Sequence, residues 1–181
     1  DFDGKTCVIT IGAEIASSRG ILCVAAAGNE GDTKFPYIGA PGDGKNVLTV
    51  GGVKADGVKT SFSSIGPTAD GRIKPDVMSF AYAVSVTSPS GGFFESNGTS
   101  FATPSLAGLA ACLWQARNSY PESEIREIIK QSANNYSTPN SEYGYGIPDF
   151  RLSKDKVDNV KPITGTKEDK NTFEILFVKT V

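Results

Sequence analysis

The sequence predicts an α/β fold, a parallel β-sheet with helices on both faces. Three observations indicate this class. A segment whose apolar residues recur at helical spacing is followed at once by a run that is apolar at every position. Further β-rich runs recur along the chain, and 20 glycines among 181 residues are typical of many tight turns between short elements. A chain of this length is expected to form about one domain with a buried core.

The first predicted helix covers residues 1–20. Its apolar residues recur at helical spacing: Val8, Ile11 and Ile15. Asp3 or Thr6 is the expected N-cap, because short polar side chains satisfy the free N–H groups at a helix start. We expect this helix to cover one face of the sheet.

Four β-rich runs are the candidate strands: residues 21–29, 46–53, 59–64 and 82–88. The first, "ILCVAAAGN", is apolar on both faces, which is typical of a central strand in a parallel sheet. The others are shorter or mixed, and Gly, Pro and Asp turns separate them.

The run of residues 100–118, "SFATPSLAGLAACLWQARN", predicts a helix buried inside the fold, because it is small and apolar nearly all round. Pro104 has no N–H to bond to the Ser100 carbonyl, so little regular helix can precede Ser100. The helix is therefore expected to begin at the serine.

A surface helix is predicted over residues 119–133. Ser119 and Glu122 have the spacing of a capping box, with Pro121 in the first turn. The inward stripe is expected to consist of isoleucines: Ile125, Ile128 and Ile129.

The composition changes near residue 152. Residues 1–152 read as a compact domain, whereas residues 153–181 are first polar and charged and then β-like, "TFEILFVKTV". We interpret the second part as a linker followed by a strand, which could open another domain.

The overall charge is uninformative about a substrate and excludes some partners. Eighteen basic and 20 acidic residues give a formal net charge of −2 without a block of either sign, so neither nucleic acid nor an anionic membrane is expected. No apolar run approaches the roughly 18 residues of a membrane span. Cys23 and Cys112 lie in apolar runs and are expected in the core, while Cys7 lies near a helix start.

Ser100 and Asn29 are the candidate functional residues. Serine before a helix is most often a cap, and asparagine after glycine at a strand end is most often a turn residue. However, a serine at a helix start lies among free backbone N–H groups that can bind a developing oxyanion. An amide at the carboxyl end of a parallel strand points to where ligands bind in such sheets, and it could donate to the same oxyanion.

Together these segments resemble the subtilisin-like serine proteases. The resemblance is carried by "VAAAGNEG" and "NGTSFATPSLAGLAA", with "SFSSIGPTADGRIKPDV" between them and "YGYGIPD" after them. It runs from about Thr6 to Leu152, and the order and separations of the segments agree with the family.

The resemblance implies a serine endopeptidase that acts on protein or peptide substrates and needs no cofactor. Ser100 would be the nucleophile, with the Asn29 amide and the Ser100 backbone N–H as oxyanion donors. One wall of the pocket for the substrate residue before the scissile bond would be formed by Ala25, Ala26, Ala27 and Gly28. Calcium is common in the family, but the chain has no dense Asp/Asn loop, so no metal is expected. The family also suggests secretion or a cell-surface location.

Three departures from the family pattern stand out. Ser105 replaces a common His, Phe101 replaces a common Met, and "DVMSFA" at residues 76–81 lacks a common Pro-Gly pair. The first should leave the chemistry intact. Phe101 could change the pocket shape, and the loop at residues 76–81 could run differently.

The largest departure is that the chain contains no His. A Ser-His-Asp protease needs that base, and in subtilisins the Asp and the His precede the Ser. We therefore interpret the chain as the carboxyl-terminal part of a protease domain, incomplete at its N-terminal side and inactive alone. The missing part of the sheet would leave an open edge that favours self-association. The alternative is a catalytically inactive binding or structural domain.

No other group in the sequence is a convincing substitute for the base. The acidic candidates, Glu30, Asp43, Asp70 and Asp76, lie in predicted loops where carboxylates usually face solvent. Lys45 and Lys74 are likewise expected to be solvated charges rather than members of a Ser-Lys pair.

Overall fold

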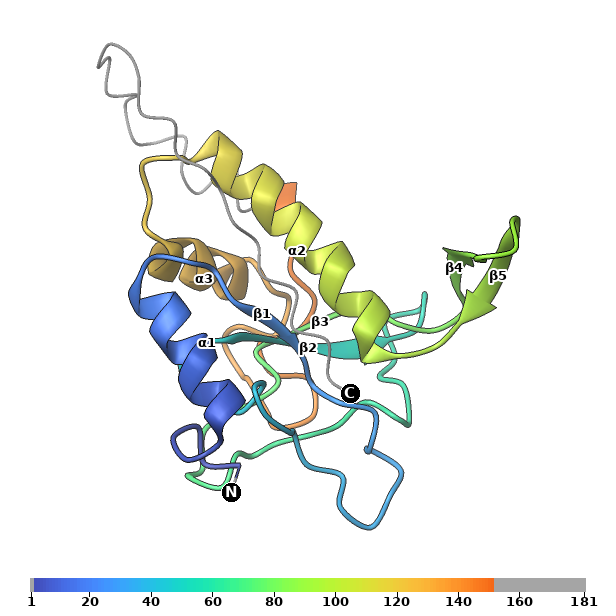
Figure 1. Ribbon diagram of the computed structural model, residues 1–181, viewed down its shortest axis with the longest axis horizontal. Helices are drawn as coiled ribbons and strands as arrows, with labels where there is room; N and C mark the ends of the chain where they lie inside the picture. The colour runs from blue at the N-terminus through green and yellow to red at the C-terminus, as the bar shows by residue number, and fades with distance from the viewer. Residues whose placement is uncertain (1, 152–181) are drawn as a thin grey trace.

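A computed structural model describes residues 2–151 of the chain; the predicted linker and strand at residues 153–181 lie outside them. Its centre is a parallel three-stranded sheet with the order β1-β2-β3 (Figure 1). The strands are β1 (Val24–Ala26), β2 (Leu48–Val53) and β3 (Val77–Phe80). In the described part of the sheet, β1 is an edge strand rather than the central strand that its composition predicts.

Helices cover both faces of this sheet, as the sequence predicts. Alternate residues of β1 point to opposite faces. Val24 joins the main core with α2 (Thr99–Ala116) and α3 (Glu122–Gln131), whereas Ala25 packs with Ala13 of α1 (Val8–Ser18). The main core contains residues from all three strands and both helices: Leu48, Val50, Val77, Leu106, Ala107, Ile125 and Ile129. The result is a three-layer α/β arrangement.

The first helix differs from its prediction at its start. It begins at Val8 with Cys7 as N-cap and no side-chain cap bond, while the Asp3 carboxylate accepts the N–H groups of Lys5 and Thr6 in a turn before it. The predicted apolar stripe faces outward, and Val8 is 80% exposed. The side facing the sheet carries small residues instead: Thr10, Ala13 and Ser17.

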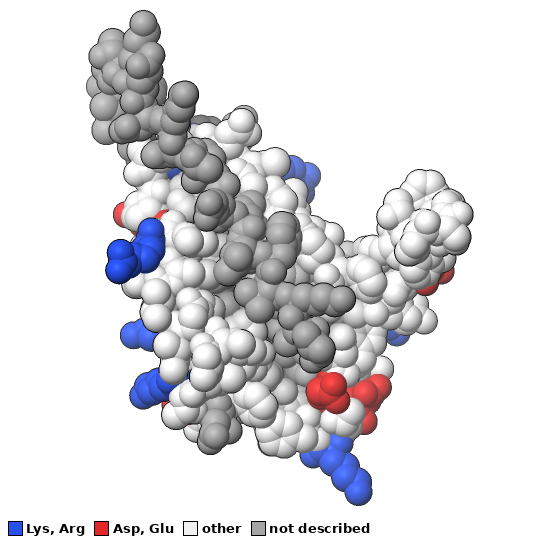
Figure 2. Space-filling model, viewed as in Figure 1, with Lys and Arg blue, Asp and Glu red and all other residues white. Residues whose placement is uncertain are grey.

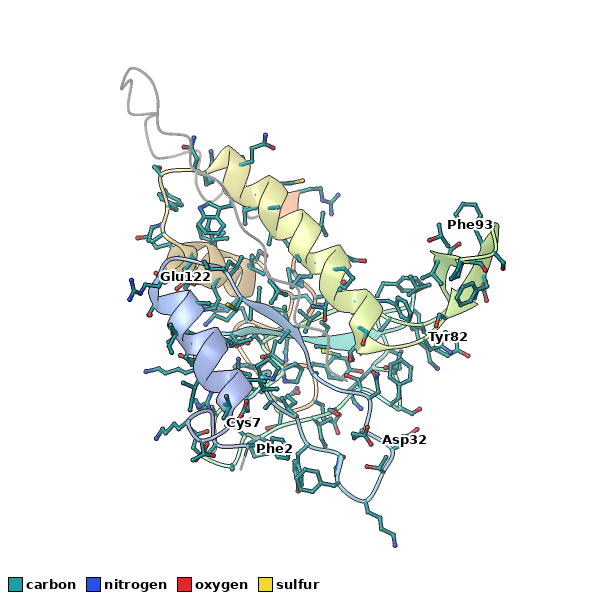
Figure 3. All side chains as sticks on the ribbon, viewed as in Figure 1. Phe2, Cys7, Asp32, Tyr82, Phe93 and Glu122 are labelled. Atoms are coloured by element: carbon teal, nitrogen blue, oxygen red, sulfur yellow. The ribbon has the colours of Figure 1, made fainter. Side chains whose placement is uncertain are left out.

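Small and polar residues can face inward because each hydroxyl has a buried partner. Thr10 Oγ1 donates to Asp43 Oδ1 at 2.7 Å, and Ser17 Oγ donates to Glu122 Oε1 at 3.0 Å. Glu122, labelled in Figure 3 near the end of α1, therefore joins α1 to α3. Helical periodicity cannot reveal such partners, so it does not indicate which face of α1 is buried.

The strand expected at residues 59–64 does not form; only Lys59 makes an isolated bridge, to Val53. Ser63 and Ser64 in this segment bond to the backbone of neighbouring segments, which competes with a strand ladder. The run at residues 82–88 does contain a strand, β4 (Val84–Thr87). It pairs antiparallel with β5 (Phe93–Ser96) in a separate hairpin that projects from the body, carrying Phe93 near its tip (Figures 1 and 3).

Both later helices form, with different boundaries and surroundings. α2 begins at Thr99, one residue before Ser100, and only one side of it is buried among residues 2–151. Leu109 is 47% exposed and Cys112 is also exposed, so the expectations of an all-round buried helix and of Cys112 in the core are wrong here.

In α3, Pro121 is the N-cap and makes no side-chain cap bond, so the predicted capping box is absent. Glu122 bonds instead to Ser17 and, through its second oxygen, to Arg126 Nη1 at 2.7 Å. Ile125 and Ile129 are buried as predicted. Within residues 2–151, no helix is long and apolar enough to cross a membrane.

Buried charges are the main correction to the sequence interpretation. Lys74 is only 2% exposed, and its ammonium donates to the Val47 carbonyl, Thr49 Oγ1 and the Asp76 carboxylate. Burial lowers the pKa of Lys74, while the charge of Asp76 opposes that shift. Asp43 and Asp76 are also buried. On the visible face, the charged side chains are scattered mainly near the margins (Figure 2).

Asp70, in contrast, lies at the surface. Its carboxylate forms an ion pair with Arg72 at 2.8 Å. Hydrogen bonds from Arg72 and then from Thr68 lower the pKa of Asp70 to about 2. This carboxyl group is therefore ionised near neutral pH, and its low pKa makes it too weak a base to take a proton from a hydroxyl there.

We expect Lys74→Met to lower the free energy of unfolding by about 3–5 kcal/mol, because the Asp76 carboxylate then stays buried without its counter-charge. Asp76→Asn in the same background should recover part of the loss, since it removes that charge. Urea denaturation measures both effects. If Lys74→Met alone were as stable as its parent, the Lys74–Asp76 ion pair would not be needed for the stability of the fold.

Candidate functional site

The candidate site lies at the carboxyl edge of the sheet, where ligands bind in open α/β folds. The Ala81 N–H donates to the carbonyl of Val53, the last residue of β2, at 2.9 Å. The Gly98 N–H donates in turn to the Ala81 carbonyl at 2.9 Å. These two bonds hold the start of α2 against the ends of β2 and β3. β1 ends at Ala26, so the residues that follow it reach the same edge.

The structure brings Asn29 against the residue that precedes Ser100. Asn29 Oδ1 accepts the Thr99 backbone N–H at 2.9 Å and lies 3.0 Å from Thr99 Oγ1. Thr99 Oγ1 also lies 3.2 Å from the Gly28 carbonyl. Thr99 is fully buried and joins the two segments, a role that the sequence interpretation missed because threonine before a serine carries no distinctive signal.

Two N–H donors are left free beside the Ser100 hydroxyl. Ser100 is exposed in the first turn of α2, where its backbone N–H has no acceptor in the described part of the chain. Asn29 is exposed too, and because its Oδ1 accepts the bonds from Thr99, its Nδ2 remains without a partner among residues 2–151. No acidic side chain occupies the first turn of α2. Such an arrangement can stabilise negative charge that develops on a carbonyl oxygen.

The four residues of the predicted pocket wall divide into two groups. Ala25, Ala26 and Ala27 are 1%, 6% and 0% exposed, whereas Gly28 is half-buried next to Asn29. Gly28 has a φ of +110°, a conformation that side chains rarely adopt. Their role in binding a substrate residue remains a prediction.

The three departures from the family pattern have definite positions. Phe101 is half-buried, and Ser105 is exposed with its Oγ donating to the Phe101 carbonyl at 3.1 Å. "DVMSFA" forms β3 and continues to Ala83, which has a φ of +53°. The segment thus leads from the sheet into the β4–β5 hairpin.

Neither a base nor a metal cluster accompanies Ser100. The 181-residue sequence contains no His. Between residues 2 and 151, no group of three or more Cys, Asp or Glu side chains could hold a metal ion. The geometry therefore offers a hydroxyl and two N–H donors, without the group that would accept the hydroxyl proton.

Comparison with known proteins places this geometry in a family. The sequence model described as "Subtilase family" matches residues 4–146. The chain belongs to the subtilase family. Among curated relatives of this subtilase chain, Subtilisin NAT from Bacillus subtilis subsp. natto is 32% identical over 145 residues, 80% of this chain and 36% of the relative. Subtilisin BL from Lederbergia lenta is 34% identical over 132 residues, 73% of this chain and 45% of the relative.

Solved structures agree with the fold. The structure titled "self-cleaved protease domain of PatA" is 25% identical with a TM-score of 0.70, covering 88% of this subtilase chain and 58% of that one. The Prenylagaramide maturation protease PagA, at 23% identity and a TM-score of 0.65, shares the fold. The chain spans about a third to a half of the length of these curated subtilisins.

Proposed function

We propose that the protein containing this chain is a serine endopeptidase, with Ser100 as nucleophile and Asn29 as side-chain donor of the oxyanion hole. Membership of the subtilase family supports a serine-type peptidase in general. The observation that carries the residue assignment is the pair of contacts from Asn29 Oδ1 to Thr99. They hold the free Nδ2 beside the helix start that carries Ser100.

In the proposed reaction, Ser100 Oγ forms a bond to the carbonyl carbon of a peptide while its proton passes to a base. The carbonyl oxygen takes up the electron pair of the C=O π bond, and Asn29 Nδ2 and the Ser100 N–H donate to it. Collapse of this intermediate breaks the C–N bond, and the base returns the proton to the leaving amine. Water then hydrolyses the acyl-enzyme by the same steps in reverse order.

The base must come from outside these 181 residues, because they contain no His. We propose that a His, oriented by an Asp, is supplied by another part of the same protease domain. The chain by itself is then inactive, and its exposed apolar side chains, among them Val8 and Leu109, would favour self-association. Secretion or a cell-surface location remains a prediction from the family resemblance.

A fluorophosphonate probe tests this proposal, because it reacts with a serine only when the hydroxyl is activated. We expect labelling of Ser100 in the full-length protein, mapped by peptide mass spectrometry, and none in the isolated 181-residue chain. Strong labelling of the isolated chain would contradict the need for an external base. An unlabelled full-length protein would favour the inactive binding domain instead.

A further inference from the structure

We propose that Ser64 is a positioning residue for Asn29, holding the loop that carries the oxyanion donor. The inference rests on the proposed function and assigns a role to the "SFSS" segment, Ser61–Ser64, which contributes no group to the chemistry. Ser64 is 0% exposed and therefore cannot touch a substrate. It can act only through the residues that it contacts.

Ser64 bonds to the backbone on both sides of Asn29. Its N–H donates to the Gly28 carbonyl at 3.0 Å, and its Oγ accepts the Glu30 N–H at 3.1 Å. Ser64 thus bonds to the backbone of both residues that flank Asn29 in the chain. On its other side, the Asn29 side chain bonds to Thr99 and to no other residue among 2–151. The position of Nδ2 therefore depends on Thr99 and on Ser64.

The same loop is shaped to fit the segment around Ser64. A Cβ on Gly28 would lie 2.8 Å from Ser64 Oγ, so a side chain there would collide with the hydroxyl. Gly31 donates its N–H to the Phe62 carbonyl at 2.8 Å, and a Cβ on it would collide with the carbonyls of Ser61 and Ser63. Both glycines allow the loop to lie close against residues 61–64, where the Ser64 hydroxyl accepts the Glu30 N–H.

Removing the Ser64 hydroxyl would leave the Glu30 N–H without its acceptor, and the loop would move to find another. Displacement of a catalytic group by about 1 Å can cost about 100-fold in rate. The Asn29 donor acts on the transition state, so the loss should appear in kcat and not in KM.

Ser63 provides a matched control. It is also 0% exposed, and its Oγ accepts one backbone N–H, that of Gly52 in β2, at 3.0 Å, and makes a longer contact of 3.5 Å to the Ser64 carbonyl. Ser63→Ala removes a hydroxyl of the same size and burial one position away. It leaves the Ser64 bonds to the Asn29 loop in place.

The experiment compares kcat and KM of the full-length protein and its Ser64→Ala and Ser63→Ala variants on a chromogenic peptide. We expect Ser64→Ala to lower kcat at least 10-fold with KM within about 2-fold, and Ser63→Ala to change kcat less than about 2-fold at a similar loss of Tm. In an Asn29→Ala background, Ser64→Ala should lower kcat less than 2-fold further, because its effect passes through Asn29.

Equal kcat values for the two serine variants, or a full additional loss in the Asn29→Ala background, would overturn the inference. If Ser64→Ala does not fold, Ser64→Cys replaces it, because a thiol fills the site but is a weak acceptor. Its kcat is then compared with that of Ser63→Ala and measured again in the Asn29→Ala background, with the same expected results. A wild-type protein with no activity refutes the proposed function instead, so the two failures are distinguishable.

Discussion

Replacing Ser100 with alanine in the full-length protein will lower kcat by about 10⁶-fold, the loss that removing the nucleophile causes in a subtilisin. In the proposed mechanism, the Ser100 hydroxyl is the group that forms the acyl-enzyme. The fold should not change, because Ser100 is exposed and its Oγ has no bond within residues 2–151. Hydrolysis of a chromogenic peptide and thermal unfolding measure the two effects.

Ser105→Ala is the matched control for this substitution. Ser105 is exposed on the same helix and bonds only to the Phe101 carbonyl. We expect its variant to keep the wild-type kcat. If Ser100→Ala retained more than about a thousandth of the activity, another residue would have to be the nucleophile.

Loss of the Asn29 amide is expected to lower kcat by about 100- to 1,000-fold with little change in KM, because in the proposed mechanism its Nδ2 donates to the oxyanion of the transition state and not to the bound substrate. This magnitude is typical of one oxyanion-hole donor, and it was established for a subtilisin. Asn29→Ala also removes the two contacts to Thr99, so a structural effect would be mixed with the catalytic one.

Asn29→Asp separates these effects. The carboxylate can still accept both bonds from Thr99, but it has no N–H to donate and adds a negative charge where the oxyanion would form. We expect a kcat at least as low as that of Asn29→Ala, with a Tm closer to wild type. Wild-type kcat in Asn29→Asp would refute the role of the amide as donor.

The sequence predicted most reliably those elements that depend on residues adjacent in the chain. The apolar run before Asn29 became β1, the small apolar run after Ser100 became α2, and the α/β class is confirmed. Errors arose where long-range partners mattered. Residues 59–64 have a strand-like composition but form no strand. The hydroxyls of Ser63 and Ser64 accept backbone N–H groups of other segments, and such side-chain bonds compete with the hydrogen bonds of a β-ladder.

The candidate site divides in the same way. Ser100 and Asn29 could be selected from the sequence because each belongs to a recognisable segment. Thr99 and Ser64 could not, because their importance comes from bonds to residues 70 and 34 positions away, Asn29 and Glu30. Composition also predicted a solvated Lys74, which tertiary contacts with Val47, Thr49 and Asp76 bury.

By itself, the sequence determined the fold class and most of the helices and strands, and its resemblance to the subtilisin-like proteases singled out Ser100 and Asn29 as candidate catalytic residues. Local composition and periodicity are enough for the fold class and the elements, because they act within a few residues. Only the tertiary structure decided which face of α1 is buried, where Lys74 finds its partners, and which residues hold the Asn29 loop. Those outcomes depend on hydrogen bonds and burial between distant segments, and no local pattern encodes which distant group will satisfy a given N–H or charge.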